Sequence, residues 1–356
     1  MSKGIRFFLK FIAFFIALGL IVCALLLGAA AYFNMPPKKV YPEDTLLFEV
    51  RKGESADSVG RRLEDAGIIR NRYFWYLMFR LDGEYVKAGS YKITLPVSQT
   101  EIRSILTGGE QVLVKVTIPE GVTLKKAARI LEEGGICGAD DFIGAAGSRE
   151  ILDSYAVPGS SMEGYLYPDT YLFPLSYPAS KTVMSMADNF FTRIQAIAQE
   201  VSMEANPDRN GSPLSLSMDD LNKRIIIASI VEREYRVPDE AAIMAGVFFN
   251  RLKIGMALQS CATVEYVITE IQGRPHPEVL YNRDLEIRDP YNTYLHPGLP
   301  PGPISAPGET ALKAAFSPAA TDYLYFRLID PSTGKHYFSR TMDDHIRAAS
   351  LYVKGN

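Results

Sequence analysis

Glu232 is the residue of this chain best suited to acid–base chemistry, because it ends a run that should be buried. The run, Ile225 to Val231, is apolar apart from Ser229. Burying a carboxylate without a partner is costly and raises its pKa. A carboxyl group with a raised pKa keeps its proton near neutral pH and can serve as a general acid. The sequence therefore predicts Glu232 as a catalytic residue.

The helix that would position Glu232 has a recognisable start. Ser217 is followed by Asp220, as in a capping box. At helical spacing, one face then carries Leu221, Ile225, Ala228 and Glu232. Glu232 is thus expected level with the core. Glu234 is expected to be a solvated or ion-paired residue at the helix end, although it stays a substrate-binding candidate. Pro238 should then open a second helix that ends near Gly255.

The stretch from Glu163 to Tyr171 combines aromatic rings, a proline turn and two carboxylates. Aromatic faces stack on the CH faces of sugar rings, and carboxylates accept hydrogen bonds from hydroxyls. Glu163, Tyr167 and Asp169 are therefore substrate-binding candidates. The alternative is that the tyrosines are core residues with locally bonded hydroxyls, and for any single tyrosine we favour that interpretation.

Composition fits an ordinary globular protein with an added apolar segment: 356 residues, 47% hydrophobic, 22% charged and a net charge of −3. The length exceeds that of one typical domain. The absence of a basic excess gives no support for nucleic acid as a partner. We expect an α+β fold.

The N-terminal segment predicts a membrane anchor. Residues 11–33 carry no charge, and about 20 such residues suffice to cross a bilayer. The basic residues before this span are Lys3, Arg6 and Lys10. They should hold residues 1–10 in the cytoplasm and place the rest of the chain outside. A cleaved signal peptide is the main alternative. Residues 34–44 are expected to be a polar linker.

The cysteines and histidines predict no metal site. Cys23 lies in the apolar span, and Val22 is a poor residue before a lipidated cysteine, so we expect a plain membrane cysteine. Cys137 and Cys261 have no CxxC motif or nearby histidine, and a disulfide between them remains an open alternative on which we do not rely. The four histidines lack metal-ligand spacing.

Residues 45–112 are expected to form a small domain of strand, helix, helix and strand. The helices should cover 56–66, after the cap Ser55, and 73–81, between strands at 46–50 and 88–93. This order and the KGES turn resemble a LysM-like glycan-binding module, and a simple spacer is the alternative. A larger mixed catalytic domain should occupy 113–356, with a helix from the cap Thr123 to about Glu133. Residues 202–217 are expected to be a mobile loop.

Several motifs together resemble one family. They are IVERE at 230–234, NRLKIGMALQS at 250–260, YNTY at 291–294 and GLPPGP at 298–303. The resemblance is to the MltG (YceG-like) family of endolytic murein transglycosylases, and it covers nearly the whole chain. It implies a single-pass bacterial inner-membrane protein that cuts growing peptidoglycan outside the membrane and leaves 1,6-anhydro sugar ends.

The resemblance also implies roles for residues. The family's catalytic glutamate matches Glu232, which would protonate the glycosidic oxygen and then, as a carboxylate, accept the proton of the muramic 6-hydroxyl. Supporting or substrate-binding roles would fall to Glu163, Gln259, Asn292, Asp169, Glu234, Asn250 and Thr293. Stacking roles would fall to Tyr167, Tyr266, Tyr291 and Tyr294. Where many members read LQSDPTV, this chain has Cys261 in place of the aspartate, so an acidic group close to the expected cleft is lost.

Three other functions are weighed against this one. A conventional hydrolase would need a second carboxylate, from Glu163, Asp169 or Glu234. A non-catalytic wall scaffold would use only the LysM-like module and an aromatic cleft. An aminodeoxychorismate lyase, a name this family has also carried, would need pyridoxal phosphate, for which no lysine context is evident. We expect no cofactor. The family resemblance implies peptidoglycan, the membrane and peptidoglycan synthases as partners.

Overall fold

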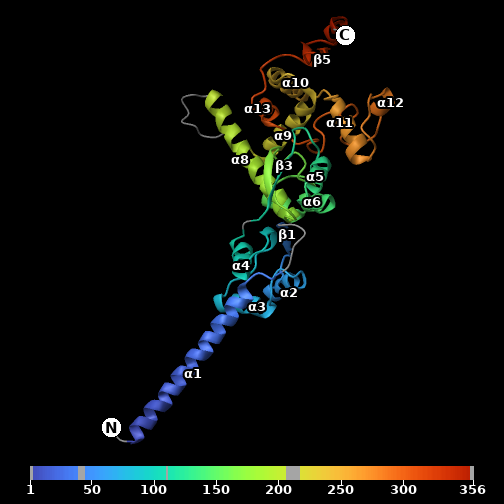
Figure 1. Ribbon diagram of the computed structural model, residues 1–356. Helices are drawn as coiled ribbons and strands as arrows, with labels where there is room; N and C mark the ends of the chain where they lie inside the picture. Colours follow the sequence, from blue (N-terminus) through green and yellow to red (C-terminus); the bar gives the residue numbers. More distant parts are fainter. Residues whose placement is uncertain (1–2, 39–44, 110, 206–216, 353–356) are drawn as a thin grey trace. The chain divides into compact units, whose positions relative to one another are not determined.

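The computed structural model describes residues 3–38, 45–109, 111–205 and 217–352 (Figure 1). The chain divides into two compact units. The first contains Met1–Leu113 and Pro174–Ser176, and the second contains Val114–Phe173 and Tyr177–Asn356. The described residues form helices and three separate two-stranded sheets, so the chain mixes helix and strand as expected.

The first unit begins with the long helix α1, Lys3–Asn34. Its stretch Phe7–Asn34 has a mean hydropathy of 2.9, and no residue of its apolar window is buried. A helix of this length is about 40 Å long, enough to cross a bilayer. The helix extends beyond the predicted span 11–33 at both ends. Polar residues such as Lys10 and Asn34 can continue a helix while their side chains face water. Such a helix suits a single-pass anchor, and a signal sequence has the same character.

The small fold after α1 has the predicted order of elements. β1 (Thr45–Val50) pairs antiparallel with β2 (Gly89–Thr94), and α2 (Ala56–Asp65) and α3 (Arg72–Asp82) lie between them in sequence. Ser55 and Asn71 cap the two helices as side-chain acceptors. Trp75 fills the contact between the helices, because a Cβ on Gly60 would lie 2.5 Å from its ring. An additional helix, α4 (Gln99–Gly108), completes the unit.

The second unit begins with two paired strands, three short helices and one long helix. Their bounds are β3 Leu113–Thr117, α5 Leu124–Glu133, α6 Ala139–Ala146, α7 Arg149–Ser154, β4 Thr170–Pro174 and α8 Ala179–Ala205. Thr123 caps α5 as predicted. The loop predicted at 202–217 is partly wrong, because α8 continues through Ala205; residues 206–216 lie outside the described part of the chain.

The helix that carries Glu232 is α9, Met218–Glu234, and Ser217 caps it by accepting from the Asp220 amide. It packs on α13 (Glu309–Phe316) and on α10 (Ala241–Lys253), which follows a 3₁₀ turn at Pro238–Glu240. Every residue from Ile225 to Val231 is at most 2% exposed. A helix that is apolar on all sides belongs in a core, and α9 is the central helix of this unit.

The rest of the unit surrounds these helices. α11 (Cys261–Tyr266) continues into a π-helical turn at Val267–Ile271, and α12 covers Asn282–Leu285. The C-terminal part contains the hairpin β5 (Tyr325–Asp330) and β6 (Lys335–Ser339), then α14 (Met342–Arg347) and a 3₁₀ turn at Ala348–Leu351.

Candidate active site

Glu232 lies in the last turn of α9, where the buried part of the helix ends. Its Oε2 accepts a hydrogen bond of 2.8 Å from the backbone N–H of Gly308, the residue that caps the N-terminus of α13. Burial raises the pKa of Glu232 to about 7, against the lowering effect of that N–H. Among the described residues, Oε1 has no hydrogen-bonding partner. This arrangement leaves one oxygen free to exchange a proton near neutral pH.

Two backbone segments fix the surroundings of Glu232. The amides of Gly121 and Ala306 bond to the carbonyls of Ala306 and Val122, each at 2.8 Å. Gly121 has φ +72°, and a Cβ on it would lie 3.6 Å from Cγ of Glu232. The Pro119–Gly121 turn and the strand-like segment before α13 are therefore held together beside the carboxyl group.

Ser229 connects α9 to the same segment. Its buried hydroxyl donates to the Ile226 carbonyl at 2.7 Å and accepts from the Ile304 amide at 3.0 Å. The hydroxyl of Ser305 donates to the Ser229 carbonyl at 2.9 Å. A small polar residue inside the apolar run thus sets the position of residues 304–308, and with them the amide of Gly308.

Glu120 is a site residue that the sequence prediction missed. Glu120 lies against Gly308, because a Cβ on Gly308 would lie 2.0 Å from Oε1 of Glu120 and would displace that exposed side chain. The Glu120 charge contributes to the raised pKa of Glu232. The available signal was the sequence IPEG, in which an acidic residue occupies a turn between a strand and a capped helix. The site therefore pairs a partly buried carboxyl group with an exposed one.

A groove of about 820 Å³ runs past Gly121, which lies next to Glu232. One wall is α5 and the loop before it, and the other contains Arg233 and residues 269–276. Its basic side chains are Lys125, Lys126, Arg129, Arg233 and Arg274, against the acidic Glu133 and Glu270. Arg233 also pairs with Glu265 at 2.9 Å. The excess of positive charge suits anionic groups on a ligand.

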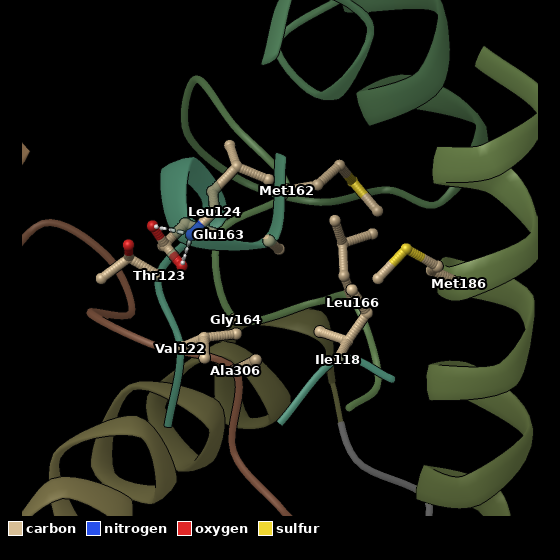
Figure 2. Close-up of a pocket in the computed structure, with 11 residues that line it drawn as sticks. Ile118, Val122, Thr123, Leu124, Met162, Glu163, Gly164, Leu166, Met186 and Ala306 are labelled. Carbon is tan, nitrogen blue, oxygen red and sulfur yellow. Dashed lines mark hydrogen bonds between the residues drawn. The ribbon is translucent and has the colours of Figure 1, made fainter. Parts of the chain in front are cut away.

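Glu163 is buried at the N-terminus of α5. Figure 2 shows its two oxygens directed at the Leu124 amide, and both distances are 3.0 Å. Apolar side chains, among them Met162 and Leu166, line the rest of this small cavity. Burial raises the pKa of Glu163 to about 8, although the Leu124 amide lowers it.

Two of the predicted tyrosines lie next to Glu163. The Tyr266 hydroxyl is 3.4 Å from Glu163 Oε2, and the rings of Tyr266 and Tyr291 are 5.0 Å apart between centroids. Glu163 accepts from the Leu124 amide, and Glu232 lies next to Gly121, three residues earlier in the chain. The loop at 121–124 connects the two carboxyl groups.

The prediction that Glu234 is solvated or ion-paired is wrong. The Ser260 hydroxyl donates to its Oε1 at 2.5 Å, and burial raises the pKa of Glu234. Ser260 is held by Thr293, whose hydroxyl accepts from the Ser260 amide at 3.1 Å and lies 2.9 Å from that of Thr263. Glu234 bonds to Ser260, just before α11, because the chain after α10 returns to the end of α9. The local sequence around Glu234 gives no sign of this long-range contact.

The two predicted asparagines donate to backbone carbonyls of the protein. Asn292 is fully buried and donates to the carbonyls of Leu285 and Ile287 at 2.9 and 2.8 Å. Asn250 donates to the carbonyls of Thr321 and Tyr323 at 2.7 and 3.0 Å. Both amides fix loops.

Gln259 is close to Cys261 in sequence, and Tyr294 is close to it in space. Gln259 is exposed and its backbone is left-handed, with φ +49°. Its backbone N–H donates to the Thr293 carbonyl. The Tyr294 hydroxyl is 3.2 Å from Sγ of Cys261. Cys261, Cys137 and Cys23 are all free thiols, so the open disulfide alternative has no support here.

Tyr167 and Asp169 lie against α8. Tyr167 is 6% exposed, with the Arg193 guanidinium 5.4 Å from its ring centroid. Asp169 accepts from the Asn189 amide at 3.1 Å. The core interpretation favoured for a single tyrosine fits Tyr167. Over the described residues, no cluster of three or more metal-ligating side chains occurs.

These features can be compared with known proteins. The model of the YceG-like family matches residues 48–350, and the chain belongs to that family. A protein named endolytic murein transglycosylase from Bacillus subtilis strain 168 is 29% identical over 345 residues, which cover 92% of this chain and 91% of the relative. A protein of the same name from Streptococcus pneumoniae serotype 2 strain D39 is 28% identical over 92% of this chain.

The chain spans 63% of the length of that pneumococcal relative. Among solved structures, a yceG-like protein from Listeria monocytogenes has a TM-score of 0.55 and 29% identity, covering 86% of this chain and 99% of its own. The family resemblance seen in the sequence motifs is confirmed.

Proposed function

We propose that this chain is an endolytic murein transglycosylase, a lyase that cleaves bonds between N-acetylmuramic acid and N-acetylglucosamine in nascent peptidoglycan. The observation that carries the proposal is Glu232, a partly buried carboxyl group with a pKa raised to about 7 beside an open groove. The names of the B. subtilis and S. pneumoniae relatives support the same reaction.

The proposed reaction uses Glu232 twice. Protonated at Oε1, it gives its proton to the glycosidic oxygen as the bond from that oxygen to the muramic C1 breaks. The muramic 6-hydroxyl then attacks C1 and gives its proton to the Glu232 carboxylate. The products are a free hydroxyl on the departing sugar and a 1,6-anhydro ring, with no water consumed. A pKa near the ambient pH allows both proton transfers.

The groove beside Glu232 would hold the substrate. Peptidoglycan strands carry carboxylates on their muramic peptide stems, and the basic side chains of the groove suit such groups. Glu163, Tyr266 and Tyr291 would form the floor beyond the loop at 121–124. We further assign Gln259 and Tyr294, which lie near Cys261, to the rim of the substrate cleft, at the position where the family motif LQSDPTV has an aspartate.

Location follows from α1. As a single-pass anchor with residues 1–10 in the cytoplasm, it would place both units outside the bacterial cytoplasmic membrane. An enzyme tethered there reaches strands near their point of synthesis, so peptidoglycan synthases of elongation or division are the expected partners. The strand, helix, helix, strand unit is proposed to be a LysM-like module.

The test is digestion of purified glycan strands by the wild type and by Glu232→Gln, with mass spectrometry of the new ends. The expected result is 1,6-anhydro ends from the wild type and a loss of 100-fold or more in the variant, since general acid–base catalysis contributes roughly 10²–10⁴-fold. Glu150→Gln, the same change on the exposed surface of α7, is the matched control. Undiminished cleavage by Glu232→Gln, or binding without cleavage by the wild type, would favour a scaffold.

A conventional hydrolase is the second candidate, and Glu120 is the observation in its favour. Of the carboxylates considered from sequence, Glu163, Asp169 and Glu234 are each held by other partners, whereas Glu120 lies next to Glu232. A hydrolase would use such a second group to activate water. Reducing ends in place of anhydro ends would establish hydrolysis.

A further inference from the structure

α3 in the first unit has two apolar faces, only one of which is packed. Trp75, Met78 and Phe79 face the core. On the other side, at helical spacing, lie Tyr73, Tyr76, Leu77 and Leu81, with exposed fractions of 66%, 42%, 47% and 74%. We call these four residues the outer face of α3. A contiguous exposed set of tyrosines and leucines marks an interaction surface.

The outer face starts beside the end of the apolar anchor. Phe74, in the first turn of α3, packs against Phe33 in the last turn of α1, with ring centroids 6.2 Å apart. Phe33 belongs to the apolar span that ends at Asn34. Tyr73 and Leu77 are one and three residues from Phe74. They therefore lie near the level at which α1 leaves the bilayer.

The junction between α1 and the small fold is held by several polar contacts. The Asn34 side chain accepts from the Thr100 amide at 3.0 Å and donates to the Thr100 hydroxyl at 3.2 Å. Arg70 donates to the carbonyls of Met35 and Pro36 at 2.9 and 2.8 Å, and its guanidinium lies over Tyr32 at 4.8 Å. The orientation of α3 relative to the last turn of α1 is thereby fixed.

The charges around the outer face also suit a membrane surface. Arg80 is exposed on the same side of α3 as Leu77 and Leu81. The acidic residues after it, Asp82 and Glu84, both pair with Arg103, at 2.5 and 2.6 Å. Tyrosine, leucine and arginine together are typical of the boundary between headgroups and acyl chains, where arginine extends its charge into water.

We propose that the outer face of α3 lies in the headgroup region of the leaflet from which α1 emerges, so that the first unit docks on the membrane. The proposal rests on the membrane anchor of the proposed function. A lipid surface fits better than a glycan, because the leucines offer no hydrogen bond to sugar hydroxyls.

The test uses the full chain, with its three cysteines changed to serine, in vesicles of phosphatidylcholine and phosphatidylglycerol. A polarity-sensitive fluorophore is attached at Leu77→Cys or, as the control, at Leu113→Cys. Leu113 is an equally exposed leucine, at 54%. The backbone N–H of its neighbour Val112 donates to the Ser90 carbonyl, near the start of β2. The other end of β2 leads to α4 and the junction with α1, and the six residues of the strand span roughly 20 Å.

The expected result is blue-shifted emission at position 77 and quenching by lipids that carry a nitroxide near the headgroup, with neither effect at position 113. Equal emission and quenching at both positions would overturn the proposal. So would a blue shift at 77 without lipid quenching, which would mean that protein covers the face. Release of the chain by alkaline extraction would overturn the anchor and the docking together. Glycan cleavage, measured separately on the same samples, tests the proposed reaction without bearing on docking.

Discussion

The exposed carboxylate of Glu120 is expected to tune the acid–base group, and Glu120→Gln should show this. The charge of Glu120 raises the pKa of Glu232, so neutralising it lowers that pKa. For an exposed partner, an interaction of about 1 kcal/mol corresponds to about 0.7 pH unit. In the proposed reaction, Glu232 must be protonated at the start. Activity therefore falls as pH rises through the Glu232 pKa of about 7. This falling limb of the pH profile should move to lower pH by about 0.7 unit in Glu120→Gln.

The assay is the pH dependence of kcat/KM on purified strands, since this ratio reports groups of the free enzyme. Glu150→Gln removes the same charge from the surface of α7 and should leave the limb in place. A limb that stays fixed or moves to higher pH in Glu120→Gln would refute the electrostatic reasoning. Loss of activity at every pH would instead identify Glu120 as a second reacting carboxylate.

Three further changes test the surrounding structure. Gly308→Pro removes the amide that donates to Glu232, and should raise the pKa of Glu232 by about 1 to 2 units relative to Gly308→Ala, read from the same pH profile. Ser229→Ala leaves the buried Ile304 amide unpaired and should cost about 1–3 kcal/mol in the free energy of unfolding, measured with denaturant. Glu163 has a pKa of about 8 in the folded protein, so the free energy of unfolding of the wild type should fall as pH rises from about 4.5 through 8. Glu163→Gln should lose most of this pH dependence, as measured by thermal melts.

Much of the scaffold was predictable because its signals are local. Ser217 caps α9 and Thr123 caps α5 where the sequence indicates, since a cap depends on residues within one helical turn. The burial of Ile225 to Val231 follows from their composition, and Glu232 stands at the edge of this run. The family resemblance gave Glu232 its proposed reaction, whereas the helix pattern alone gave only its position.

The residues around Glu232 were not predictable, because they come from two segments that are distant from it in sequence. Glu120 and Gly308 reach the carboxyl group only after the 119–122 turn and residues 304–308 pair through their backbones. Asn292 has the residue type of a ligand-binding amide, yet its bonds go to carbonyls of its own loop. Residue type indicates what a side chain can do, and only the fold shows which partners it has.

The proposed reaction assigns two proton transfers to one carboxyl group, and opposing influences on the pKa of that group fit this assignment. Burial favours the protonated form of Glu232 and the nearby charge of Glu120 adds to it, while the Gly308 amide at the start of α13 favours the carboxylate. Burial alone would give a good acid and a poor base, and the amide alone would give the reverse. The balance near pH 7 suits a reaction in which the proton leaves Glu232 and a second proton returns to it. A hydrolase, which divides the two tasks, has no need for this balance on one group.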